Sequence, residues 1–216
     1  MAIPIQLESD QKPTSTIVPV FMSILLPTSE AAFRRAEELF STGDNTTGFM
    51  HLLLAARLAD RPEALQLPVN LQPYAAELPR YASLLEELRS RAQRGRSSAY
   101  APYSGYSVGS ALLATDGTIW SGCNVESSSY GLTICAERTA LVTAVANGKR
   151  RFAAVAVATQ SSPPASPCGN CRQMLYEFAP DALVLMLNPE GGERWATLRL
   201  LLPDAFEAES LPEKGH

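Results

Sequence analysis

Three cysteines in the second half of the chain occupy positions from which they could bind a metal ion. Cys135 lies in the segment ICAER, and Cys168 and Cys171 lie in the segment SPCGNCRQ. Each segment stands at the predicted start of a helix, where free backbone N–H groups and the positive end of the helix dipole favour a thiolate over a thiol. Cys168 and Cys171 are three residues apart and therefore share one helical face. Three thiolates suit zinc, which binds sulfur, prefers tetrahedral geometry and is redox-silent.

The fourth position of such a zinc site has no evident protein ligand in the sequence. Cys123 is the one remaining cysteine, and we interpret it as a small buried hydrophobic residue. The two histidines, His51 and His216, are distant from the cysteines, which also leaves little for a Ser–His–Asp or Cys–His mechanism. A catalytic zinc keeps its fourth position open for water, whereas a structural zinc has four protein ligands. The pattern therefore favours a catalytic site.

Glu137 follows Cys135 by two residues and could move a proton beside that metal. A glutamate in the first turn of a helix can also simply complement the helix dipole. A zinc-stabilised, non-catalytic interaction module would not need an acid–base group, but hydrolysis by an activated water does. We therefore interpret Glu137 as a catalytic proton shuttle and keep the interaction module as an alternative.

The elements that must position these residues follow from the apolar pattern after residue 82. An Asp116-Gly117 turn between two apolar runs is a strong hairpin signal. Residues 152–159 (FAAVAVAT) are continuously apolar, as expected of a strand covered on both faces. The order α-β-β-α-β-α-β-β predicts an α/β fold, a mixed sheet with helices packed on it. The predicted helices are 83–96, 134–147, 168–178 and a turn at 197–202, and the predicted strands are 108–115, 118–124, 152–159, 182–187 and one near Arg194.

The first 82 residues form a separate extension in this interpretation. Residues 1–28 are proline-containing and lack a helical period, which predicts an irregular arm. Residues 29–40 and 49–58 have helical apolar faces and predict a helical hairpin. Four prolines in residues 61–80 predict a surface linker. The expected organisation is an arm and hairpin of unassigned role at 1–82 and a catalytic domain at 83–216.

Composition excludes several other classes of protein. The chain has 216 residues, 46% hydrophobic and 19% charged, with a net charge of −4. A nucleic-acid-binding protein or one that binds anionic membranes would need a basic surface, so neither partner is expected. The longest apolar stretch, residues 17–26, is too short to span a membrane, which takes about 20 residues. A Cys-X-X-Cys pair without a secretory signal favours metal or redox chemistry, and we expect a reducing, cytoplasmic setting.

Residues from about 83 to 211 closely resemble cytidine deaminases of the short, homotetrameric, three-cysteine zinc type. The resemblance implies the fold of that family, an α-β-α sandwich around a mixed five-stranded sheet, here with an N-terminal helical extension. The zinc-deaminase signature is the pair C-A-E and P-C-x-x-C. The matching segments are AYAPYSGYSVGSALL (99–113), DG (116–117), GCNVESSSYGLTICAERTAL (122–141), SPCGNCRQ (166–173) and LLPDAF (201–206).

The resemblance implies a reaction and the residues that carry it. Cys135, Cys168 and Cys171 would bind one zinc per chain, and the chain would hydrolyse cytidine and 2′-deoxycytidine to the uracil nucleosides and ammonia, as in pyrimidine salvage. Glu137 would take a proton from water, deliver it to N3 of the base and later protonate the departing amine. Arg138 would donate to the zinc thiolates and offset the net negative charge of the metal centre.

The resemblance also implies how the nucleoside is bound. Asn124 and Glu126 would hydrogen-bond the ribose 3′-hydroxyl, which favours cytidine and 2′-deoxycytidine as substrates. Deamination of another amino-heterocycle, such as a nucleoside antibiotic, is the second alternative function. The backbone N–H of Ala136 and the carbonyl of Ser166 would contact the base. The full set of expected substrate-binding residues is Tyr106, Asn124, Glu126, Tyr130, Ala136, Ser166 and Phe206.

Two of these residues carry further expectations. Tyr106 stands where the family commonly has phenylalanine, so the aromatic ring is kept and a hydroxyl is added. Phe206 corresponds to a phenylalanine that tetrameric family members insert into a neighbour's nucleoside pocket. A homotetramer is therefore favoured, with a dimer as the alternative if residues 1–82 cover the contact surfaces.

Overall fold

The structure is a computed structural model that describes residues 28–58, 67–208 and 211. The predicted arm, residues 1–28, lies outside this part except for its last residue. The helices are α2 (Ser29–Ser41), α3 (Asn45–Leu58), α4 (Leu78–Arg96), α5 (Ala136–Ala146), α6 (Gly169–Tyr176) and α7 (Leu198–Leu201), with 3₁₀ helices η2 (Val69–Glu77) and η3 (Tyr130–Leu132). The strands are β1 (Gly109–Ala114), β2 (Ile119–Cys123), β3 (Phe152–Ala158), β4 (Leu183–Leu187) and β5 (Glu193–Thr197).

The five strands form one mixed sheet, which confirms the predicted fold class. Their order is β2-β1-β3-β4-β5. The pair β3–β4 is parallel and the other three pairs are antiparallel. The chain connects β3 to β4 through α6, the crossover that a parallel pair requires. β1, β3 and β4 are buried along their whole length, in agreement with the continuous apolar pattern of β3.

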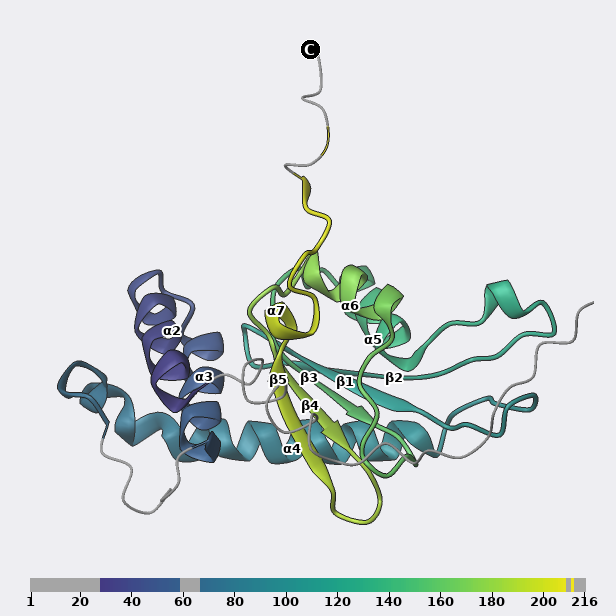
Figure 1. The fold of residues 1–216 in the computed structure, drawn as a ribbon, viewed down its shortest axis with the longest axis horizontal. Coiled ribbons are helices and arrows are strands. Elements are labelled where there is room, and N and C mark those ends of the chain that lie inside the picture. The colour runs from purple at the N-terminus through teal and green to yellow at the C-terminus, as the bar shows by residue number, and fades with distance from the viewer. Residues whose placement is uncertain (1–27, 59–66, 209–210, 212–216) are drawn as a thin grey trace, which may run out of the picture.

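Helices cover both faces of this sheet. Helix α4 runs across one face, and α5, α6 and α7 lie over the other (Figure 1). Alternate residues of β3 supply the two cores: Ala154 faces the α4 side, and Val155 and Val157 face the α5–α6 side. This arrangement brings the N-termini of α5 and α6, where the three cysteines were predicted to lie, to the same side of the sheet.

The N-terminal hairpin shares a core with the α4 side of the sheet. Helices α2 and α3 contribute buried residues such as Phe40 and Phe49 to the cluster that also contains Leu183. Rings from separate elements stack within it: Phe40 on Tyr74 with centroids 3.7 Å apart, and Phe49 on Tyr81 with centroids 4.0 Å apart. The hairpin is therefore packed as part of the fold.

Two predicted boundaries were wrong in this region. The segment 61–80 is not a linker throughout, because it contains η2 and the start of α4; residues 59–66 lie outside the described residues. Pro79 stands in the first turn of α4, where its missing N–H removes no helical hydrogen bond. Helix α3 starts at Asn45 instead of residue 49, because Asp44 caps it by accepting a hydrogen bond from the Thr47 N–H at 3.3 Å.

Asp181 joins the hairpin to the rest of the fold. Its carboxylate accepts hydrogen bonds from Arg35 on α2 at 2.7 Å and from Arg199 on α7 at 2.8 Å. Its backbone carbonyl lies 2.9 Å from Nε2 of His51 on α3. His51 is 4% exposed, and this burial lowers the pKa of its imidazole. Folded His51 is therefore the neutral tautomer that donates from Nε2.

This buried histidine makes stability depend on pH. The unfolded chain takes up a proton on His51 below about pH 6.5, whereas the folded chain resists that protonation. The contribution of His51 to the free energy of unfolding is therefore complete above that pH and is lost as pH falls. We expect the free energy of unfolding to fall between pH 7.5 and 5.5, with His51 contributing at most about 1.4 kcal/mol per pH unit. His51→Gln should make this decline shallower. Urea unfolding of both proteins at the two pH values measures it, and equal declines would contradict the assignment.

Candidate metal centre and substrate pocket

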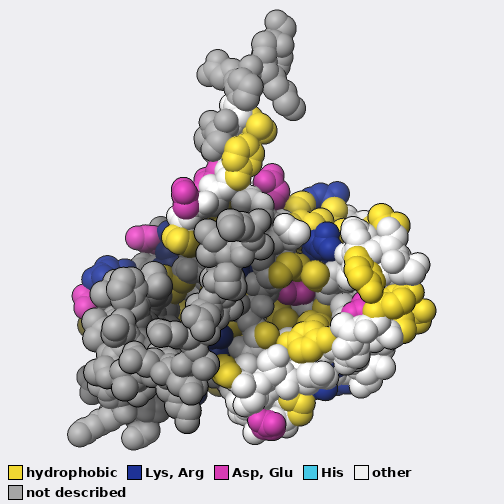
Figure 2. Space-filling model, turned by 45° about the vertical axis from the view of Figure 1, so that its right-hand side comes forward, with side chains coloured by type: hydrophobic (Ala, Val, Ile, Leu, Met, Phe, Trp, Pro, Cys, Tyr) yellow, Lys and Arg dark blue, Asp and Glu magenta, His cyan; other side chains and the backbone are white. Residues whose placement is uncertain are grey.

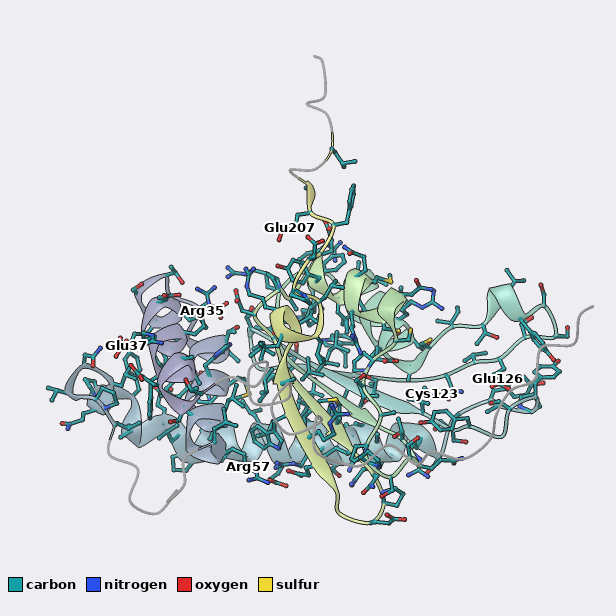
Figure 3. The ribbon with its side chains drawn as sticks, in the orientation of Figure 1. Arg35, Glu37, Arg57, Cys123, Glu126 and Glu207 are labelled. Carbon is teal, nitrogen blue, oxygen red and sulfur yellow. The ribbon has the colours of Figure 1, made fainter. Side chains whose placement is uncertain are left out.

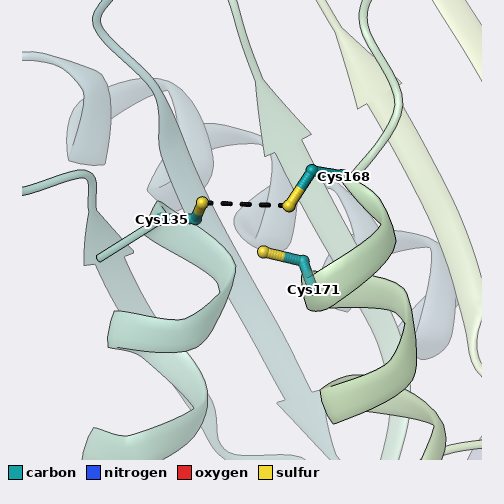
Figure 4. A group of neighbouring side chains, drawn as sticks. All are labelled: Cys135, Cys168 and Cys171. Carbon is teal, nitrogen blue, oxygen red and sulfur yellow. Dashed lines mark hydrogen bonds between the residues drawn. The ribbon is translucent and has the colours of Figure 1, made fainter. Parts of the chain in front are cut away.

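The three predicted cysteine ligands meet at the N-termini of two helices. Cys135 is the N-cap residue of α5, Cys168 is the N-cap residue of α6, and Cys171 lies in the first turn of α6 (Figure 4). The three Sγ atoms all lie within 4.8 Å of one another, and those of Cys135 and Cys168 are 3.9 Å apart. Cys171 is fully buried, Cys135 is half-buried and Cys168 is exposed.

This geometry fits a zinc ion. Tetrahedral zinc with Zn–S bonds of about 2.3 Å holds its sulfurs about 3.8 Å apart, close to the separation of Cys135 and Cys168. The donor set is entirely thiol, and each helix N-terminus supplies the positive potential that a thiolate needs. The three cysteines therefore form a site for one zinc, and among the residues that the structure describes no fourth cysteine, histidine or carboxylate belongs to the cluster.

The electrostatics of the cluster favour ionised sulfur at Cys135. The pKa of Cys135 is lowered to about 5, mainly by the hydrogen bond that it accepts from Cys171, with smaller contributions from Cys168 and Arg138. The pKa of Cys171 is raised by the same hydrogen bond and by burial. Arg138 also donates from Nη2 to the Thr133 carbonyl at 2.8 Å, which holds its guanidinium at the start of α5.

Glu137 lies beside this cluster in a protected position. It is 4% exposed, and burial is the main reason that the pKa of its carboxyl is raised. Glu137 lines the same cavity as Cys135 and Cys168. A buried carboxyl whose pKa is raised holds a proton more readily than an exposed one, as a group that transfers protons must.

The cavity next to the cysteines has a volume of about 220 Å³. Figure 2 shows this face of the molecule hollowed, with hydrophobic side chains around the hollow and acidic groups within it. Seven other residues were predicted to bind the nucleoside, and five of them line the cavity. These five are Tyr106, Asn124, Glu126, Ala136 and Ser166.

The Asn124–Glu126 pair is held by hydrogen bonds to the segment before β1. Asn124 is buried; its Oδ1 accepts from the Val108 N–H at 2.8 Å, and its Nδ2 donates to the Tyr106 carbonyl at 2.9 Å. The Glu126 carboxylate accepts from the hydroxyl and N–H of Ser104, which holds the pKa of Glu126 below its usual range. The pair thus presents a fixed amide and a charged carboxylate at the cavity. Ser104 and Val108 were not singled out from the sequence, because their role depends on contacts across about 20 residues.

Tyr130 and Phe206 do not line the cavity of their own chain. Tyr130 in η3 is 76% exposed, and Phe206 is 58% exposed. Gln173, a residue of α6, holds the backbone of Phe206. Its Oε1 accepts from the Phe206 N–H at 3.1 Å, and its Nε2 donates to the Phe206 carbonyl at 2.7 Å. Glu207, which directly follows Phe206 in the chain, is labelled in Figure 3.

Cys123 differs from its predicted environment. The side chain is partly exposed, and its Sγ lies 3.3 Å from the Ser98 carbonyl. The interpretation as a buried hydrophobic residue was wrong because β2 is an edge strand of the sheet. Figure 3 labels Cys123, the last residue of β2, and Glu126, which follows it in the chain.

Comparisons with known proteins agree with this geometry. The family model described as "Cytidine and deoxycytidylate deaminase zinc-binding region" matches residues 82–187. A cytidine deaminase of Sporosarcina psychrophila is 47% identical over 128 residues, which are 59% of this chain and 94% of that protein. One of Halalkalibacterium halodurans is 46% identical over 125 residues, 57% of this chain and 95% of that protein.

Solved structures give the same result for the fold. The cytidine deaminase of Burkholderia pseudomallei has a TM-score of 0.55 at 48% identity, covering 56% of this chain and 98% of that one. A mutant cytidine deaminase of Mycobacterium tuberculosis has a TM-score of 0.52 at 38% identity, covering 59% of this chain and 98% of that one. The similarity thus spans nearly the whole of each relative and somewhat more than half of this chain. Among the residues that the structure describes, no helix is long and apolar enough to cross a membrane.

Proposed function

Because this chain belongs to the cytidine deaminase family, we propose that it catalyses the zinc-dependent hydrolysis of cytidine and 2′-deoxycytidine to uridine and 2′-deoxyuridine, with release of ammonia. One observation carries this proposal beyond the family membership. Two of the three clustered cysteines, Cys135 and Cys168, border one cavity together with the buried Glu137, so the metal site and a proton shuttle face the same substrate space.

The chain's own residues account for the proton transfers. Cys135, Cys168 and Cys171 would hold the zinc. Bound zinc would act as a Lewis acid and lower the pKa of a water molecule. Glu137 would take one proton from the water and deliver it to N3 of the base as the water oxygen bonds to C4. It would then take the remaining proton of that oxygen and give it to the amino group, which leaves as ammonia when the C4–N bond breaks. Its burial and raised pKa support this role because the carboxyl must retain a proton between two steps.

The remaining cavity residues are proposed to orient the nucleoside. Ala136 is the first residue of α5, so its N–H has no partner within the helix and can donate to O2 of the base. The Ser166 carbonyl would accept from the amino group that leaves. Asn124 and Glu126 would bind the ribose 3′-hydroxyl with their remaining capacity, and the charge of Glu126 would repel a 5′-phosphate or a polynucleotide.

Ultraviolet monitoring of the purified protein with cytidine and 2′-deoxycytidine tests this function. We expect the absorbance change of cytosine-to-uracil conversion with both nucleosides, its loss with a zinc chelator and its return with added zinc. A panel containing cytidine 5′-monophosphate and free cytosine checks the substrate class. Turnover of another amino-heterocycle in place of both nucleosides would overturn the proposal.

The thiol ligands would need a reducing compartment, which supports the cytoplasm as the proposed location.

The active site is further proposed to be completed by a second copy of this chain, in a homotetramer or a dimer. Tyr130, Leu132, Val142 and Phe206 are large apolar residues between 46% and 76% exposed, and such exposed groups favour burial against a partner. Phe206 lies outside the cavity of its own chain, so it would close the cavity of a neighbour over the base. Gln173 would fix its direction.

Phe206→Ala should therefore raise KM for cytidine while leaving the zinc content unchanged. Loss of an aromatic contact of about 0.5–1.5 kcal/mol, together with lost burial, predicts an increase of roughly 10-fold or more. Steady-state kinetics and elemental analysis measure the two quantities. Light scattering coupled to gel filtration gives the oligomeric state, and a fully active species at the monomer mass of 23.3 kDa would refute the shared site.

A further inference from the structure

One hydrogen bond connects two segments that both contribute residues to the lining of the candidate substrate cavity. Tyr106 lies on the segment between α4 and β1, and Ser161 lies on the loop between β3 and α6. The Tyr106 hydroxyl and the Ser161 Oγ are 2.6 Å apart. Tyr106 lines the cavity, and so do Ala165 and Ser166, which follow Ser161 in the loop. The bond therefore joins elements that the sequence separates by 55 residues.

Both partners of this bond are attached to fixed groups. On one side the Tyr106 carbonyl accepts from Asn124, a buried residue of the cavity, at 2.9 Å. On the other side the Ser161 carbonyl accepts from Nδ2 of Asn188 at 3.2 Å. Asn188 is 4% exposed, and its Oδ1 accepts from the Gly192 N–H at 2.7 Å. The hydroxyl bond thus connects two backbones that are each held from within the fold.

We infer that Ser161 is a positioning residue that holds the Tyr106 ring as a fixed wall of the nucleoside cavity; this inference rests on the proposed function. A tyrosine with a free hydroxyl could turn about its side-chain bonds, and substrate binding would then have to order it. Restraining the ring in advance removes that entropic cost from binding. Because Ser161 does not line the cavity, it acts on the substrate only through Tyr106 and should influence binding more than the chemical step.

Two substitutions remove the bond from opposite ends. Ser161→Ala deletes the serine hydroxyl, and Tyr106→Phe deletes the phenol hydroxyl but keeps the ring. The net value of one hydrogen bond predicts that each raises KM for cytidine by roughly 3- to 10-fold. We expect kcat to change by less than about 2-fold, since the metal centre and Glu137 are untouched. Because both variants lose the same bond, the double variant should be no worse than either single one.

Matched variants separate this role from general damage to the loop. Ser162→Ala removes the neighbouring, exposed serine hydroxyl and should keep the wild-type KM. Ser161→Thr retains a hydroxyl and should restore most of the binding that Ser161→Ala loses. Fully additive effects of Ser161→Ala and Tyr106→Phe, or a fall in kcat at unchanged KM, would overturn the inference.

Amide hydrogen exchange of residues 159–167 provides a readout that does not depend on catalysis. Ser161→Ala and Tyr106→Phe should accelerate exchange in this loop to the same extent, and Ser162→Ala should not. Unchanged exchange in both variants would show that the bond does not restrain the loop and would overturn the inference. A wild-type protein with no activity on cytidine would instead refute the proposed function, and exchange would still decide whether the bond restrains the loop.

Discussion

Replacing Cys171 by serine should remove zinc and activity together. Cys171 is the fully buried member of the cysteine cluster, and a serine hydroxyl is not deprotonated near neutral pH as a zinc-bound thiol is. Changing a residue that merely supports a metal ligand costs about 10- to 100-fold in affinity or activity. Loss of a ligand itself should exceed that, so we expect activity to fall by more than about 100-fold. Elemental analysis should find far less than one zinc per chain.

Cys123→Ser is the matched control for that experiment. It makes the same chemical change at a cysteine on the sheet edge that does not belong to the cluster, and should leave zinc content and kcat/KM near wild-type values. Zinc binding also stabilises the folded state by mass action. The melting temperature of the wild type should therefore fall on treatment with a chelator, whereas that of Cys171→Ser should not. Stoichiometric zinc in Cys171→Ser would contradict the ligand set.

The metal centre could be predicted from sequence because its parts are local. Cys135 and Glu137 are two residues apart, Cys168 and Cys171 are three apart, and both pairs stand at helix starts that apolar periodicity identifies. Only the meeting of the two helix ends is non-local. The two helix ends meet because β3 is a buried strand covered by helices on both faces. The continuous apolar run of that strand was itself visible in the sequence.

Contacts between distant segments account for what the sequence did not show. The stacking of Phe49 on Tyr81 explains why the hairpin belongs to the main core, but the two residues lie in separate elements with no shared periodicity. The Pro-rich segment before α4 was misassigned because a proline in a first helical turn has the same sequence signature as one in a linker. The bond between Tyr106 and Ser161 depends on tertiary structure alone.

Replacing Glu137 by glutamine should abolish most catalysis while preserving the metal and the fold. Glutamine has nearly the same shape and can keep the buried position, but it cannot carry a proton between water, base and amine. General acid–base groups contribute about 10²–10⁴-fold to the reaction rate. We therefore expect kcat for cytidine to fall by at least about 100-fold. KM should change far less, because the groups proposed to hold the nucleoside remain in place.

The decisive comparison is between zinc content and turnover in the same preparations. Glu137→Gln should bind about one zinc per chain and melt at or above the wild-type temperature, because it replaces a buried ionisable group by a neutral one. Glu177→Gln makes the same substitution at an exposed site beyond the end of α6 and should retain wild-type kinetics. If Glu137→Gln turned over cytidine within a few-fold of wild type while fully loaded with zinc, another group would have to move the protons. If it lost zinc, Glu137 would be supporting the metal centre, and the separation between ligand and proton shuttle would fail.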